Sequence, residues 1–107
     1  MSELDTWEQV NEKVMRKIHE PGEALMAMEV RFAQGGVGAE HSHPHEQLTY
    51  CLEGKLEFTL NGEKRVISAG ESLVIPGGTV HDALALEKSR LLDIFTPLRE
   101  DLLNKND

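Results

Sequence analysis

Three of the five histidines of this chain, His41, His43 and His45, lie within five consecutive positions. In an extended strand, residues i and i+2 project from the same face, so the imidazoles of His41 and His43 would point in one direction. Pro44 supports this interpretation, because a residue that precedes proline avoids the helical conformation. Two neighbouring imidazoles form half of a site for a divalent metal ion. His45 has the same parity and is a competing ligand, although it falls where the chain is expected to turn.

Two side chains further along the sequence could complete such a site. Gln47 shares the parity of the histidines and could add an amide oxygen. His81 follows a predicted turn and could approach from a neighbouring strand. Three neutral imidazoles and one amide oxygen suit a borderline divalent ion such as Zn, Ni, Fe, Mn or Co. The alternative is a polar surface loop that binds no ion, and the isolated His19 is expected to be solvated.

A second group of residues with chemical potential lies near the C-terminus. Asp93 and Phe95 share strand parity, whereas Leu92 and Ile94 face the other way. A carboxylate that points into an apolar interior is costly unless it is functional or paired, so a structural Asp93 bonded to Arg99 or to a turn is the alternative. Arg99 at the mouth of a cavity would suit a carboxylate, because its planar guanidinium can donate two parallel hydrogen bonds. Taken alone, Phe95 is a core residue and Arg99 is a solvated charge on a helix.

Short runs of β-forming residues, separated by turns that contain glycine, are expected to position these side chains. Strands are predicted over residues 25–32, 47–52, 55–60, 64–68, 72–75, 79–86 and 90–95. Asn61-Gly62 is a strong hairpin signal, and the absence of a long helix predicts an all-β sandwich or barrel. Thr96-Pro97 predicts a short helix over residues 98–103, with Thr96 as its N-cap and Pro97 at its first position. Residues 1–20 could form an amphipathic helix or an extended arm.

Length and charge limit the classes of partner. The 107 residues predict one domain over residues 25–107, preceded by a polar segment over residues 1–24 that packs on the domain or on a partner subunit. The 11 Lys and Arg against 19 Asp and Glu give a net charge of −8. This balance excludes the clustered basic surface that nucleic-acid binding needs and disfavours contact with anionic membranes.

The expected compartment is the cytoplasm. The first residues lack the basic and apolar regions of a secretory signal, and no apolar run reaches the ~18 residues of a membrane-spanning helix. Cys51 is the only cysteine, which excludes an internal disulfide and a cysteine-based zinc site. We expect Cys51 to be a core residue and Tyr50, with the opposite strand parity, to lie outside.

The spacing of the histidine segment resembles the first motif of the cupin family. In order, Gly35, five residues, His41, one residue, His43, three residues, Gln47, six residues and Gly54 follow that motif, with Gln where Glu is usual. A second stretch resembles the second cupin motif. It comprises Gly70, five residues, Pro76, one residue, Gly78, two residues and His81, with Ala85 where Asn is usual. The resemblance implies a jelly-roll β-barrel with a metal ion in its interior.

Residues 41–47, 50–54 and 92–101 are similar to the small pectin-degradation cupins of the KdgF type, including the exchange of Glu for Gln. Such proteins convert 4,5-unsaturated monouronates, which lyases release from pectin or alginate, from the cyclic enol form to the linear 4-deoxy-5-keto-uronate. This resemblance implies the metal ligands His41, His43, Gln47 and His81. It also implies a catalytic pocket lined by Asp93, Phe95 and Arg99.

Other functions fit the same residues. The metal ligands alone would also serve a different cupin enzyme, such as a metal-dependent dioxygenase or a sugar isomerase. A non-enzymatic cupin that binds a sugar and a fold with a vestigial metal site are further alternatives. We also expect a homodimer, because small cupins are commonly dimers and the N-terminal segment could pack across a twofold axis.

Overall fold

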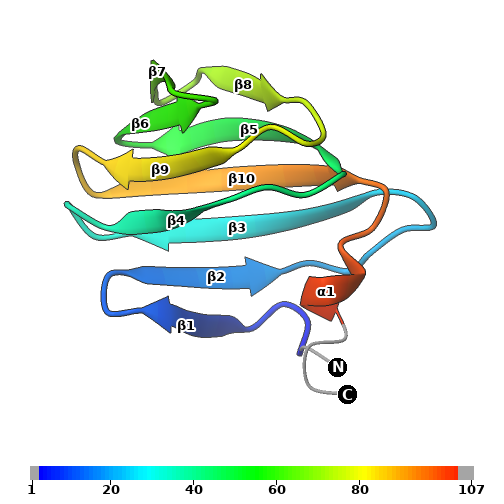
Figure 1. The fold of residues 1–107 in the computed structure, drawn as a ribbon. Helices are drawn as coiled ribbons and strands as arrows, with labels where there is room; N and C mark the ends of the chain where they lie inside the picture. Colours follow the sequence, from blue (N-terminus) through cyan, green and yellow to red (C-terminus); the bar gives the residue numbers. More distant parts are fainter. Residues whose placement is uncertain (1–2, 104–107) are drawn as a thin grey trace.

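The computed structural model describes residues 3–103, which form ten strands and one short helix (Figure 1). The elements are β1 (Trp7–Asn11), β2 (Val14–Ile18), β3 (Met26–Phe32), β4 (Val37–His41), β5 (Glu46–Glu53), β6 (Lys55–Leu60), β7 (Glu63–Ser68), β8 (Ser72–Ile75), β9 (His81–Ala85), β10 (Ser89–Thr96) and α1 (Glu100–Leu103). The strands predicted from the sequence correspond to β3 and β5 to β10, with bounds that shift by at most two residues.

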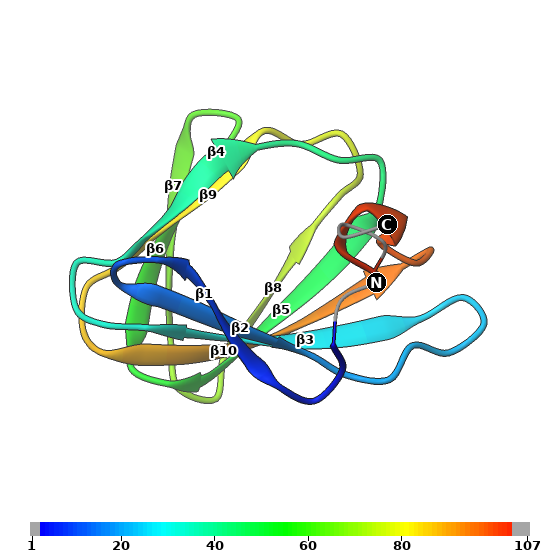
Figure 2. The ribbon, with the colours of Figure 1, turned by 90° about the horizontal axis from the view of Figure 1, so that it is seen from below.

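The strands form two antiparallel sheets that face each other as a jelly roll (Figure 2). The larger sheet has the order β1-β2-β3-β10-β5-β8, and the smaller has the order β4-β9-β6-β7. Hydrogen bonding does not continue from one sheet into the other, so the expected barrel is a jelly roll of two sheets rather than a closed cylinder. The all-β cupin class that the sequence indicated is confirmed.

Alternation along the strands directs the core into the space between the sheets. Along β3, the side chains of Met26, Met28, Val30 and Phe32 are buried, and their neighbours are more exposed. Strand β10 repeats this pattern beside β3, since every second residue of a strand projects from the same face. The buried set on β10 includes Asp93, which therefore lies on the inner face of the larger sheet.

Glycines fix two of the turns. Asn61 and Gly62 join β6 to β7 with φ values of 48° and 85°, as the predicted two-residue hairpin requires. Gly54 joins β5 to β6 with a φ of 87°. A Cβ atom at Gly54 would overlap the backbone oxygen of Lys88 and the hydroxyl of Ser89, so this position needs glycine for space as well as for conformation.

The N-terminal residues form a β-hairpin, so the helical alternative for residues 1–20 is wrong. Strand β2 pairs with both β1 and β3, which makes the segment part of the larger sheet. The helical alternative rested on Trp7, Val10, Val14 and Ile18, which recur at roughly helical intervals. In the structure Val10 lies on β1, and Val14 and Ile18 share the buried face of β2. On the other face, Trp7 packs under the cations of Lys17 and Arg31 at 4.8 and 4.2 Å.

The helix near the C-terminus is shorter than predicted. It begins at Glu100 and buries Leu102 and Leu103 at one end of the sheets. The Thr96-Pro97 peptide bond is cis, and the Thr96 hydroxyl donates a hydrogen bond to the backbone oxygen of Ala24 at 2.7 Å. Thr96 therefore ends β10, and the prediction that it caps the helix is wrong. No helix in the described part of the chain has the length and apolar character that crossing a membrane demands.

Candidate metal centre

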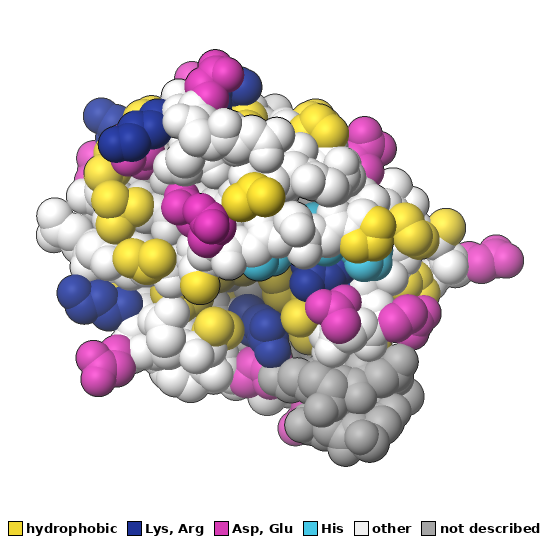
Figure 3. Space-filling model, viewed as in Figure 1, with side chains coloured by type: hydrophobic (Ala, Val, Ile, Leu, Met, Phe, Trp, Pro, Cys, Tyr) yellow, Lys and Arg dark blue, Asp and Glu magenta, His cyan; other side chains and the backbone are white. Residues whose placement is uncertain are grey.

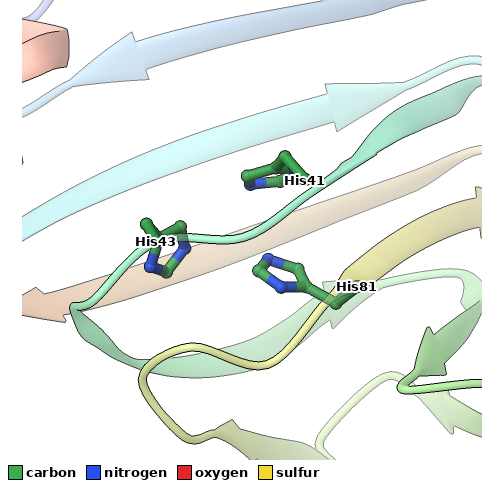
Figure 4. Close-up of side chains that lie close together, drawn as sticks. All are labelled: His41, His43 and His81. Atoms are coloured by element: carbon green, nitrogen blue, oxygen red, sulfur yellow. The ribbon is translucent and has the colours of Figure 1, made fainter.

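The three predicted histidine ligands converge from two neighbouring strands and one loop (Figure 4). His41 ends β4, His43 lies in the loop that follows, and His81 begins β9 directly opposite His41 in the ladder. One ring nitrogen of each histidine lies within 4.8 Å of the other two. His43 and His81 are buried, which argues against a merely solvated surface loop.

Backbone carbonyls fix the tautomer of each imidazole. In each ring Nδ1 faces a carbonyl oxygen, which only accepts, so Nδ1 carries the proton and Nε2 keeps its lone pair. The Nδ1 to oxygen distances are 2.8 Å from His41 to Ala39, 3.1 Å from His43 to His45 and 2.8 Å from His81 to Thr79. Nε2 of His81 is buried and has no hydrogen-bond partner among the described residues. A buried lone pair of this kind is suited to a metal ion.

The contact between Gln47 and His43 also favours a cation. Oε1 of Gln47 lies 3.1 Å from Nε2 of His43, yet both atoms are acceptors when His43 carries its proton on Nδ1. Burial lowers the pKa of His43, and the nearby Arg99 lowers it further, so the doubly protonated ring is disfavoured. A divalent ion that both atoms ligate would turn this contact into a favourable one. The residues present therefore fit a metal bound by three imidazole nitrogens and one amide oxygen.

Behind Gln47 runs a buried chain of hydrogen bonds to Asp93. The Gln47 amide nitrogen donates to the hydroxyl oxygen of Thr49 at 2.9 Å, and that hydroxyl donates to Oδ1 of Asp93 at 2.8 Å. Thr49 and Asp93 are directly opposite each other on β5 and β10. Burial raises the pKa of Asp93 to about 6, against the hydrogen bonds that favour its charged form.

A cavity of about 350 Å³ between the sheets brings the predicted site residues together. Its lining includes His41, Gln47, His81, Asp93, Phe95 and Arg99. The ring of His43 stands edge-on to that of Phe95, with 5.8 Å between the centroids. Figure 3 shows the hollow, with histidine side chains at its edge and basic side chains inside it.

Two arginines line the cavity. Arg99 is 8% exposed, with its guanidinium 5.0 Å from the centroid of the Phe95 ring, and it donates to the carboxylate of Asp101 from Nε at 3.0 Å and from Nη2 at 2.8 Å. Arg99 is thus a buried group rather than a solvated helix charge. Arg16, on β2, donates from Nε to Glu8 at 2.7 Å. The sequence analysis missed Arg16 because it lies in the polar N-terminal segment.

The remaining histidines, His45 and His19, lie outside the cluster of His41, His43 and His81. His45 lies outside the metal-binding group, and its Nε2 contacts the backbone oxygen of Leu98 at 3.1 Å, so it is not a competing ligand. His19 is only partly solvated, and both of its ring nitrogens lie 2.8 Å from carboxylate oxygens, one of Asp5 and one of Glu29. Cys51 is fully buried and Tyr50 is exposed, as the sequence predicted.

Comparison with known proteins relates this chain to a family. The family model described as "Cupin domain" matches residues 28–95. The chain is 35% identical over 99 residues to "Pectin degradation protein KdgF" of Dickeya dadantii (strain 3937), covering 91% of this chain and 90% of that protein.

Solved structures agree with this assignment. The structure of KdgF from Halomonas sp. superposes with a TM-score of 0.85 at 41% identity, covering 91% of this chain and 90% of that one. An RmlC-like cupin from Shewanella frigidimarina gives a TM-score of 0.85 at 31% identity, covering 91% and 87%. The chain therefore belongs to the cupin family. Within that family it belongs with the pectin degradation protein KdgF.

Proposed function

We propose that this protein is a metal-dependent enzyme that converts 4,5-unsaturated monouronates, released by pectin or alginate lyases, into the linear 4-deoxy-5-keto-uronate. One observation carries the proposal: nitrogens of three histidines lie within 4.8 Å of one another, and two of these histidines, His41 and His81, line one cavity together with Asp93. The relationship to pectin degradation protein KdgF supports the substrate class.

The proposed reaction is an isomerisation without redox change. The bond between C1 and the ring oxygen breaks, the C1 hydroxyl loses its proton to give an aldehyde, and the ring oxygen becomes an enol hydroxyl on C5. C4 then gains a proton and the enol hydroxyl loses one, which leaves a ketone at C5. A divalent ion held by His41, His43, Gln47 and His81 would supply Lewis acidity toward the sugar carboxylate and an adjacent oxygen.

The chain's own groups have separate tasks in this proposal. Asp93 moves the proton between the enol oxygen and C4, because its carboxyl lies on the cavity wall and is held by Thr49. Arg99 binds the substrate carboxylate with the protons that Asp101 does not take, the two on Nη1 and the second on Nη2. Arg16 adds a second cation to the cavity wall, which also carries Glu40 and Asp82, and Arg16 itself is paired with Glu8. The ring of Phe95 forms an apolar wall beside His43.

The test is a coupled assay in which a lyase releases the unsaturated monouronate and the ultraviolet absorbance of its double bond is followed. We expect the absorbance to fall when the protein is added, to persist after treatment with a chelator, and to fall without oxygen consumption. Oxygen uptake would indicate a dioxygenase, and a sugar acid that binds without turnover would indicate a binding protein.

The role of Asp93 is tested by the isosteric Asp93→Asn variant. Loss of a proton-transfer group typically costs a factor of about 10²–10⁴ in rate. We therefore expect kcat to fall in that range while the metal content of the protein is retained. Full activity of the metal-loaded variant would refute the proton-transfer role.

A further inference from the structure

We infer that Thr49 is a positioning residue for the metal centre, whose hydroxyl orients the amide of Gln47 so that the carbonyl oxygen faces the histidines. The inference rests on the proposed metal site and concerns how that site is kept in shape. Thr49 accepts a hydrogen bond from the amide nitrogen of Gln47, so it would act on the metal through Gln47.

The direction of the hydrogen-bond chain follows from proton counting. The amide nitrogen of Gln47 has protons to give and cannot accept, so the oxygen of Thr49 must be the acceptor in their 2.9 Å contact. The hydroxyl has one proton, and its other close partner is Oδ1 of Asp93 at 2.8 Å. Gln47 therefore donates to Thr49, and Thr49 donates to Asp93, which only accepts. With its nitrogen held in this way, the amide can present only its oxygen to His43, 3.1 Å away.

The same counting explains the glutamine at position 47, where the cupin motif usually has glutamate. A carboxylate has no proton to donate to Thr49, so it would compete with Asp93 for the single hydroxyl proton. Gln47 and Thr49 project from the same face of β5, and both are buried, Thr49 with 0% exposure. Because Gln47 is only 5% exposed, a wrongly turned amide would leave buried polar atoms unpaired. The amide and the hydroxyl thus form a matched pair.

The experiment compares two substitutions at position 49. Thr49→Val keeps the shape of the side chain and removes the hydroxyl, whereas Thr49→Ser keeps the hydroxyl and removes a methyl group. Each protein is titrated with Co²⁺, and binding is followed by the visible absorption of the bound ion. Partners that orient a metal ligand typically contribute about 10- to 100-fold in affinity, so we expect Thr49→Val to lose that much and Thr49→Ser to bind nearly as the wild type does.

A double-mutant cycle separates orientation of Gln47 from a general loss of stability. In a Gln47→Ala background there is no amide to orient, so Thr49→Val should cause no further loss of Co²⁺ affinity. Equal affinities of the Val and Ser variants, or a Thr49→Val effect that persists in the Gln47→Ala background, would overturn the inference. A wild-type protein that binds no Co²⁺ would overturn it as well.

NMR on the wild-type protein gives a readout that does not depend on whether Thr49→Val folds. The hydroxyl proton of Thr49 should exchange slowly with water and show cross-peaks to the amide protons of Gln47, whereas rapid exchange would contradict the inference. Because none of these measurements contains substrate, absence of uronate turnover would refute the proposed reaction alone and leave the Thr49 comparison standing.

Discussion

At the scale of single residues, the metal centre is organised by backbone atoms. Each of the three histidines donates from Nδ1 to a carbonyl two residues away in the sequence, so the local chain conformation orients each ring. Imidazoles that are already neutral and already turned toward one point lose little conformational freedom when an ion binds. The orientation of these rings therefore depends on having histidine at positions 41, 43 and 81 and on the backbone conformation, rather than on other side chains.

A matched pair of substitutions tests which histidines bind metal. We expect His43→Ala to lose more Co²⁺ affinity than the roughly 10- to 100-fold typical of outer partners, because it removes a ligand. His45→Ala should bind as the wild type does, since the backbone oxygen that His43 contacts is kept. Metal content after dialysis gives the measurement. Equal losses in both variants would contradict the assignment of ligands.

The direction of a side chain in a strand is a local property, so parity could indicate that His41 points inward. His43 lies in the loop after β4 and Gln47 lies on β5 in the other sheet, so the spacing of the cupin motif, rather than parity, indicated these two. Thr49 carried no comparable signal, since threonine is common in strands for conformational reasons alone. Its contact with Asp93 depends on β5 lying next to β10, a pairing between residues far apart in the sequence. The role of Arg16 likewise depends on the hairpin of β1 and β2 reaching the cavity.

At the scale of elements, turns and strand pairs set the register that brings these residues together. The turn at Gly54 connects β5, which carries Gln47 and Thr49, to β6 in the opposite sheet. The backbone of Lys88 and the side chain of Ser89 pack against this glycine, so the turn also contacts the start of β10. A disturbance there would reach both strands that form the inner wall of the site.

Two glycine substitutions separate conformational strain from overlap. Gly62→Ala meets no atom within 4 Å, so it should cost only the roughly 1–2 kcal/mol of a left-handed backbone. Gly54→Ala has a similar φ and also overlaps Lys88 and Ser89, which should add roughly 1–3 kcal/mol. Urea denaturation measures both free energies of unfolding. Equal losses would show that the packing around Gly54 is not tight.

His19 ties the residues before β1 to β3 through Asp5 and Glu29. The hydrogen bond that His19 donates to the Asp5 carboxylate raises the pKa of His19 above the ordinary 6.5, with Glu29 acting in the same direction and partial burial opposing both. A raised pKa in the folded state means that protonated His19 stabilises the fold. Its contribution is fully present below pH 6.5 and is lost as the pH rises through the higher pKa of the folded protein.

The prediction is that wild-type protein exceeds His19→Gln in stability at pH 5.5 and that the difference shrinks toward pH 8. Because the ring is partly solvated, we expect a difference below about 1 kcal/mol. Chemical denaturation at several pH values measures it. Parallel stability curves for the two proteins would contradict the assignment to His19.

The glycine turns and most strands could be predicted because their signals are local. The N-terminal hairpin could not, because Trp7, Val10, Val14 and Ile18 recur at intervals that also suit one face of a helix. The end of β10 was mistaken for a helix start because Thr96-Pro97 also suits a cap. The hydroxyl of Thr96 instead donates a hydrogen bond to the backbone oxygen of Ala24, a partner 72 positions away that the local sequence does not reveal.

At the scale of the whole molecule, the inner faces of the sheets hold the cavity while the outer face of the larger sheet keeps apolar side chains in water. Leu48 on β5 and Val74 on β8 are paired neighbours there, exposed by 37% and 52%. Tyr50 and Leu52 continue the row along β5. An apolar row on a sheet face that is otherwise solvated is typical of a contact surface.

We predict that a second copy of this chain covers that face, in line with the homodimer expected from the sequence. Light scattering should give twice the mass of one chain, and Leu48→Arg should shift the protein to the monomer. Val66→Arg, at an exposed position on β7 of the smaller sheet, is the matched control and should leave the mass unchanged. A monomeric wild type would refute the dimer, and a dimeric Leu48→Arg protein would refute the choice of face.

The placement of the four ligands also bears on how long the molecule survives. Gln47 belongs to the larger sheet, and His41 and His81 belong to the smaller one. An ion bound by all four side chains would link the two sheets. A ligand that binds only the folded state stabilises that state by mass action. We therefore expect chelation to lower the melting temperature and to speed digestion by a protease, with re-addition of metal reversing both. If the proposed site holds the ion, a cell starved of the metal would then lose the protein itself.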